Sequence, residues 1–166
     1  MGFTCTVCGR FHDQELLDVR FGLPEEIYVL ADDERRRRAV VTRSGDFATL
    51  DGSRDFARAL LELPIHDEDE RFGWGIWVRL APDDVEAVSA DWGDPDAAGR
   101  LHRGWLATTL PAYGHTLDLP GTLRFRSLDL LPAFELDDRS HVLALEQRHG
   151  ISLTRARTLA DPYRQA

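Results

Sequence analysis

One stretch of alternating side chains limits what this chain can fold into more than any other feature. Residues 72–80 read Phe-Gly-Trp-Gly-Ile-Trp-Val-Arg-Leu, and successive side chains of an extended backbone point to opposite faces. One face therefore carries only large apolar side chains: Phe72, Trp74, Ile76, Val78 and Leu80. The other face carries Gly73, Gly75, Trp77 and Arg79, and its glycines leave room for another backbone or a bulky ring. The pattern predicts a strand with one side in the core.

Other parts of the middle of the chain also favour strands. Residues 37–50 alternate loosely around Ser44-Gly45-Asp46, which predicts a hairpin, and an apolar stretch follows at 56–65. Trp105–Leu110 suits a strand or a short helix, and Leu123–Arg126 could pair with Leu130–Leu136. These segments provide enough strands for one sheet.

Helix signals stand on both sides of the strands. Three acids precede four arginines over 32–38, as the helix dipole favours, and Pro82 opens a helix over 85–92. Near the C-terminus we expect one helix from Ser140 to Gly150 and a second from Thr154 to Ala160, stopped by Pro162.

This order of segments predicts an α+β fold. We expect a twisted antiparallel sheet built from residues 37–80 and 104–136, because strands dominate the middle and helices the end. The helices would pack on one face, and a short N-terminal Cys-x-x-Cys turn would lie at an edge. With 166 residues the chain is expected to form a single domain, 1–166, with 1–12 as an appendage and 139–166 as a helix pair.

Charge and hydropathy narrow the function classes. The net charge is −9, which argues against a nucleic-acid or membrane-surface partner, since both depend on neutralising phosphates. No apolar run approaches the ~20 residues that span a bilayer, and no basic segment followed by an apolar one opens the chain, so a cytoplasmic location is expected. All 20 basic residues are arginines, which excludes Schiff-base chemistry on a lysine.

The two cysteines of the chain form a candidate metal site. Cys5 and Cys8 stand three residues apart, followed by Gly9 and then His12, a spacing that suits zinc. A closed structural site needs four ligands, and His66 or His141 could supply the fourth. The alternative is a pair of reduced thiols left over from a site now lost. A redox centre is disfavoured, because no strand precedes the motif and no convincing helix follows it.

Aromatic residues and histidines form a candidate ligand pocket. Its members are Trp74, Trp77, Trp105, Tyr113, His66 and His141. Aromatic pairs in a strand more often fill a core than line a pocket, so the core interpretation stays open beside the pocket.

Several linked motifs resemble an uncharacterised bacterial family, domain of unknown function 2199 (DUF2199). The matching stretches are Cys5-x-x-Cys8-Gly9-x-x-His12, Leu63-Pro64-Ile65-His66-Asp67, Trp74-Gly75-Ile76-Trp77-Val78, Gly104-Trp105-Leu106, Leu110-Pro111-x-Tyr113-x-x-Thr116-Leu117-x-Leu119, His141 and Glu146-Gln147-Arg148-x-Gly150-Ile151. The resemblance covers nearly the whole chain and implies a shared fold but no established activity. Phe47 stands where the family pattern often carries a third cysteine, so a complete metal site would need a histidine in its place.

The first functional hypothesis is a non-catalytic binding or interaction protein, with a protein partner or a small ligand and a zinc ion at the Cys/His turn. It rests on the lack of a nucleophile elbow and of a His-Glu-x-x-His helix. The alternative is a small enzyme with a His/Trp-lined cleft, which predicts two or more histidines beside Trp77. A DNA-binding regulator is a third hypothesis, and it requires an exposed basic face on the last helix.

Overall fold

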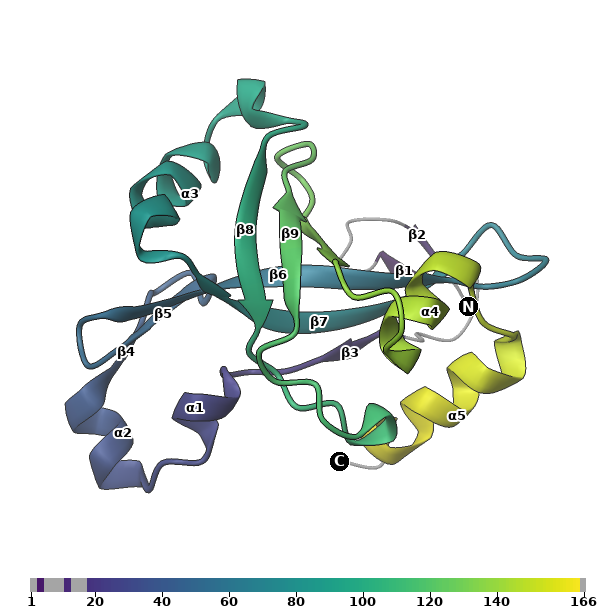
Figure 1. Cartoon of the computed structure of the whole chain (residues 1–166), viewed down its shortest axis with the longest axis horizontal. Helices are drawn as coiled ribbons and strands as arrows, with labels where there is room; N and C mark the ends of the chain where they lie inside the picture. Colours follow the sequence, from purple (N-terminus) through teal and green to yellow (C-terminus); the bar gives the residue numbers. More distant parts are fainter. Residues whose placement is uncertain (1–2, 5–10, 13–17, 165–166) are drawn as a thin grey trace.

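The fold combines helices and strands, which confirms the α+β class. The computed structural model describes residues 3–4, 11–12 and 18–164 (Figure 1). The sheet strands are β3 (Val19–Arg20), β4 (Ala39–Val41), β5 (Phe47–Leu50), β6 (Arg54–Pro64), β7 (Arg71–Leu80), β8 (Leu101–Leu106), β9 (Pro120–Arg124) and β10 (Ala133–Leu136). The helices are α1 (Glu25–Tyr28), α2 (Asp32–Arg38), α3 (Val85–Asp91), α4 (Val142–His149) and α5 (Leu153–Arg164), with 3₁₀ turns η1 (Pro82–Asp84), η2 (Pro95–Ala97) and η3 (Pro111–Tyr113).

Five of the strands close into a barrel. The order β6-β7-β8-β9-β10 is antiparallel throughout, and β10 returns to β6 in parallel through the pair Ala133 and Leu60. β5 and β4 extend from β6, and β3 runs parallel to β7. The expected twisted sheet with helices on one face is therefore not confirmed in that form. A closed barrel has an inside and an outside rather than two open faces.

The inside of the barrel is the main core. The five apolar side chains of β7 expected on one face all belong to it, as the alternation predicts: Phe72, Trp74, Ile76, Val78 and Leu80. Each is at most 3% exposed. The outward side chain of Trp77 is also fully buried, in a smaller cluster with Ile27 of α1 and Phe56 of β6. The expected close approach at the β7 glycines is confirmed, because a Cβ on Gly75 would lie 3.3 Å from Arg20 Cα.

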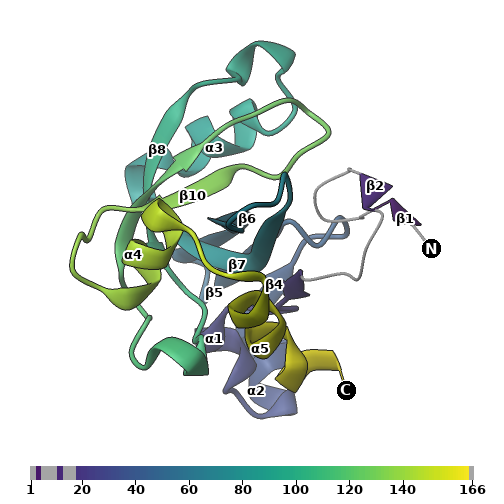
Figure 2. The ribbon, with the colours of Figure 1, turned by 90° about the vertical axis from the view of Figure 1, so that its right-hand side faces the viewer.

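Helices cover the barrel from two sides. Figure 2 shows α3 above β6 and β7, level with β8, and shows α1, α2 and α5 below these strands. The expected helices over 32–38 and 85–92 are confirmed as α2 and as α3 with η1. The expected stop at Pro162 is wrong, since α5 continues through it to Arg164. Pro162 lies in the last turn, where the missing N–H costs a single hydrogen bond, and Tyr163 beyond it packs against Trp74.

The Cys/His turn lies largely outside the described residues. β1 (Phe3–Thr4) and β2 (Phe11–His12) pair antiparallel, with Phe3 opposite His12. Cys5 and Cys8 lie in the segment between these strands, outside the described residues, as do the first and last residues of the expected single domain. The search of the described residues finds no helix long and apolar enough to cross a membrane.

Candidate functional site

Two of the predicted pocket residues, Trp74 and Tyr113, lie together inside the fold. Their rings meet edge-on with centroids 6.2 Å apart. The Tyr113 hydroxyl donates a 2.6 Å hydrogen bond to Glu146 Oε2, and Arg155 Nε donates to the other oxygen of that carboxylate at 3.0 Å. Burial and the Glu146 carboxylate together raise the pKa of Tyr113 well above its ordinary value. These contacts fasten η3, α4 and α5 to one another.

Trp77 and Trp105 lie apart from that pair, on the outer face of the barrel. Trp77 donates its indole N–H to the Phe21 carbonyl at 3.1 Å. Trp105 is half-buried, directly opposite Arg79 in the ladder, and the guanidinium carbon of Arg79 lies 4.8 Å from the centre of its ring. The structure therefore does not gather the predicted aromatic set around one cavity.

The two histidines of the predicted pocket hold backbone turns. His66 Nε2 lies 2.8 Å from the carbonyl oxygen of His149. His141 Nε2 lies 2.9 Å from the carbonyl oxygen of His115, and its Nδ1 accepts a hydrogen bond from Leu143 N at the start of α4. Both imidazoles are bonded to backbone segments, and neither contacts Trp77 in the described structure.

In the part of the chain that the structure describes, no group of three or more His, Cys, Asp or Glu side chains lies close enough together to hold a metal ion. Cys5, Cys8 and the side chain of His12 fall outside it.

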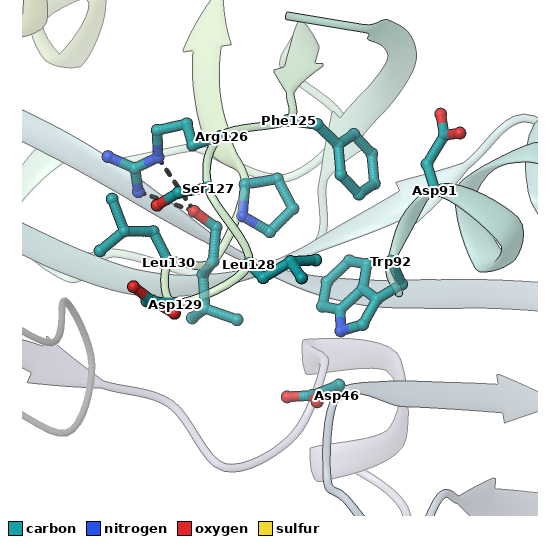
Figure 3. A pocket seen from close by; sticks show the side chains of 11 residues that line it. Asp46, Asp91, Trp92, Phe125, Arg126, Ser127, Leu128, Asp129 and Leu130 are labelled. Carbon is teal, nitrogen blue, oxygen red and sulfur yellow. Dashed lines mark hydrogen bonds between the residues drawn. The ribbon is translucent and has the colours of Figure 1, made fainter. Parts of the chain in front are cut away.

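A first cavity lies between the end of α3, the start of β5 and the loop before β10. Figure 3 shows its wall, and its volume is 180 Å³. Its principal side chains are Asp46, Asp91, Trp92, Phe125, Arg126 and Asp129. No sequence pattern pointed to this site, because its members come from three segments without a shared motif.

The buried charges of this cavity are already paired. Asp91 is 5% exposed and is bonded to Arg100 and, at 2.7 Å, to His102 Nε2. Burial alone would raise the pKa of Asp91, but the hydrogen bonds from His102 and Arg100 hold it below its ordinary value. Arg126 donates to Glu62 at 2.6 Å and twice to the Leu131 carbonyl. Because these groups bind one another, they stabilise the loop and leave little for a ligand.

A second cavity, the α1–α5 groove, lies between α1 and the C-terminal end of α5. Its volume is 390 Å³. We define it by six side chains: Arg20, Phe21, Glu25, Tyr28, Pro111 and Tyr163. Three of these are aromatic, and Tyr28 is 65% exposed.

The groove borders the aromatic cluster around Trp74. The rings of Phe21 and Tyr163 meet edge-on at 5.7 Å, and each also contacts Trp74, at 6.2 and 6.0 Å. Burial raises the pKa of the Tyr163 hydroxyl. The predicted residues Trp74 and Tyr113 thus lie behind the wall of the groove. Sequence reasoning missed Phe21 and Tyr163 themselves, because no periodic pattern includes either.

Comparison with known proteins identifies a family and nothing more specific. A family model described as an uncharacterised protein conserved in bacteria (DUF2199) matches residues 4–151. No curated protein and no solved structure matches the chain.

Proposed function

The chain belongs to this uncharacterised bacterial family, and we propose that it is a non-catalytic binding protein that takes a small aromatic molecule into the α1–α5 groove. The observation that carries the proposal is the aromatic wall, in which the ring of Tyr163 meets the fully buried Trp74 edge-on and the ring of Phe21 contacts Trp74 at a tilt of 34°. Ligand pockets typically have volumes of about 300–1,000 Å³ and walls that are mainly apolar and aromatic. The groove meets both conditions.

The placement of the histidines supports binding over catalysis. Two or more histidines beside Trp77 in one open cleft would favour the enzyme hypothesis. Trp77 is instead buried against Ile27 and Phe56, and His66 and His141 hold separate turns. The Asp91–His102 pair resembles a catalytic dyad in its hydrogen bond, but His102 is only 12% exposed and Asp91 is shared with Arg100. We interpret that pair as structural.

The last helix gives the DNA-binding hypothesis little support. Ala156, Leu159 and Ala160 of α5 belong to the main core. Arg155 on the same helix is committed to Glu146. The described part of the chain thus uses one face of this helix for packing.

A titration with a neutral aromatic alcohol, 3-phenylpropanol, tests the proposed function. Replacement of Tyr163 by Ala should weaken binding roughly threefold to tenfold, because an aromatic pair contributes about 0.5–1.5 kcal/mol beyond buried area. Tyr163→Phe retains the ring and should bind like the original protein. The measurement is isothermal titration calorimetry.

Leu101→Ala is the control variant, since Leu101 is 61% exposed at the start of β8. Its affinity should equal that of the original protein. Equal affinities for Tyr163→Ala and Leu101→Ala would contradict the groove as the binding site, and so would the absence of any binding to the original protein.

We also propose that the N-terminal turn holds a structural zinc ion through Cys5, Cys8 and His12. The pairing of β1 with β2 supports it, because that pairing places Thr4, the residue before Cys5, opposite Phe11, the residue before His12. Protein purified without a metal-affinity tag should contain about one zinc per chain and protected thiols. Cys5→Ser should lose the zinc. Metal-free protein with two freely reacting thiols would contradict the proposal.

The cytoplasmic location and the single domain stay predictions.

A further inference from the structure

The α1–α5 groove contains two opposite charges that the described part of the protein leaves unpaired. Arg20 ends β3 and is exposed, and no described residue accepts a hydrogen bond from its guanidinium. Glu25 begins α1 and is half-buried, and its carboxylate likewise has no described partner. The adjacent Glu26 shows the contrast, since its carboxylate forms a 3.1 Å ion pair with Arg54.

Arg20 and Glu25 do not neutralise each other. An ion pair would bring their charged atoms within 4.0 Å, and among the described residues no such pair joins them. Two unpaired opposite charges in one cavity, separated by more than contact distance, form two poles. A bound molecule with its own separated charges could satisfy both.

We infer that the ligand of the groove is a small aromatic zwitterion, with a carboxylate at Arg20, an ammonium at Glu25 and a ring against Phe21 and Tyr163. This inference rests on the proposed function, because it assumes that the groove binds an aromatic molecule. Arginine suits a carboxylate through paired N–H donors, and an ammonium suits a carboxylate acceptor.

A molecule with a single charge would fit less well. An aromatic acid would place its carboxylate near Arg20 but leave Glu25 without a partner. An aromatic amine would pair with Glu25 but would be repelled by the positive charge of Arg20. The zwitterion alone uses both poles, so it should bind more tightly than either relative with the same ring.

Four probes with one ring each test the inference by calorimetry. They are L-phenylalanine, 3-phenylpropionate, 2-phenylethylammonium and the neutral 3-phenylpropanol. L-phenylalanine should bind most tightly, and Arg20→Gln should weaken it roughly threefold to tenfold, as for one partly exposed charge pair. Glu25→Gln should do the same. The affinity for 3-phenylpropanol should be the same in both variants as in the original protein.

Each variant should also discriminate between the singly charged probes. Arg20→Gln should weaken 3-phenylpropionate but not the amine, and Glu25→Gln should weaken the amine but not the acid. Arg124→Gln and Glu135→Gln are controls, because these residues form an exposed ion pair on β9 and β10. Neither control should change any affinity.

The outcomes separate this inference from the proposed function. If all four probes bind equally and neither variant changes their affinities, the inference of a zwitterionic ligand is wrong, whereas the proposal that the groove binds aromatic molecules is retained. If L-phenylalanine binds no more tightly than the alcohol, the inference is also overturned. If neither the alcohol nor any charged probe binds, both the proposed function and the inference of a zwitterionic ligand are contradicted.

Discussion

Charged side chains in this protein fall into two groups at the scale of single residues. The buried Asp91 beside the cavity of Figure 3 is bonded to His102 and Arg100. In the α1–α5 groove, Arg20 and Glu25 have no partner among the described residues. Paired buried charges stabilise a fold, whereas unpaired charges at the wall of a cavity are available to a ligand.

Replacing Asp91 by Asn should destabilise the protein by about 2 kcal/mol at pH 5, because His102 and Arg100 would lose a buried carboxylate. The folded-state pKa of Asp91 lies below its ordinary value of 3.8. The stabilisation is therefore present above that value and is lost as the pH falls through the folded-state pKa. The difference in the free energy of unfolding between the original protein and Asp91→Asn should accordingly become smaller below about pH 4. Urea unfolding of both proteins at pH 5 and at pH 3 measures this difference.

Asp118→Asn is the matched control for Asp91. Asp118 pairs with Arg79, but its side chain is 67% exposed. Its replacement should cost less than about 0.5 kcal/mol. An Asp91 variant as stable as the Asp118 variant, or a gap that does not change with pH, would contradict the structural role of the buried carboxylate.

At the scale of elements, two facing glycines make room for the barrel core. Gly104 on β8 lies directly opposite Gly121 on β9. A Cβ on Gly121 would lie 2.5 Å from the ring of Phe134 and equally close to the Glu135 carbonyl. Phe134 itself is fully buried in the main core. The ring of Phe134 therefore occupies the space that a side chain at Gly121 would fill, and Val78 occupies the corresponding space at Gly104.

Replacing Gly121 by Ala should destabilise the protein by about 1–3 kcal/mol, as overpacking does when a rigid backbone cannot move away. Gly93→Ala is the control, because a Cβ there meets nothing within 4 Å. Its stability should change by less than about 0.5 kcal/mol. Thermal and urea unfolding of both variants measure this. Equal stabilities would show that the strands separate freely at this point.

The strand β7 could be predicted from the sequence, whereas the closure of the barrel could not. A strand of strict period two identifies its own inner face, as Trp74 and Ile76 show. Closure depends on one residue pair between β10 and β6 and on Gln147 of α4, whose amide bonds both Leu136 N and the Phe134 carbonyl. The Gln147 side chain takes the hydrogen bonds that a neighbouring strand would otherwise form with β10. Such a side chain has no periodic pattern in the sequence from which its role could be predicted.

At the scale of the whole molecule, the groove brings together segments that are far apart in the chain. Residues 20–28, Pro111 and Tyr163 meet only because α5 packs against the barrel beside β3. Of the residues predicted for the ligand pocket, Trp74 and Tyr113 lie together, and both belong to apolar motifs of the sequence. Sequence reasoning selected His66 and His141 for their chemistry, and the structure bonds both to backbone carbonyls. Chemistry alone does not show where a histidine lies.

The most direct test of the central claim is a map of ligand contacts in solution by ¹H–¹⁵N NMR during titration with L-phenylalanine. The account predicts that shifts concentrate at the amides of Phe21, Gly22, Leu23, Thr109 and Tyr163, which line the groove. Amides beside the cavity of Figure 3, such as those of Trp92 and Ser127, should stay unchanged. Shifts centred on Trp92, or no shifts at all, would contradict the account.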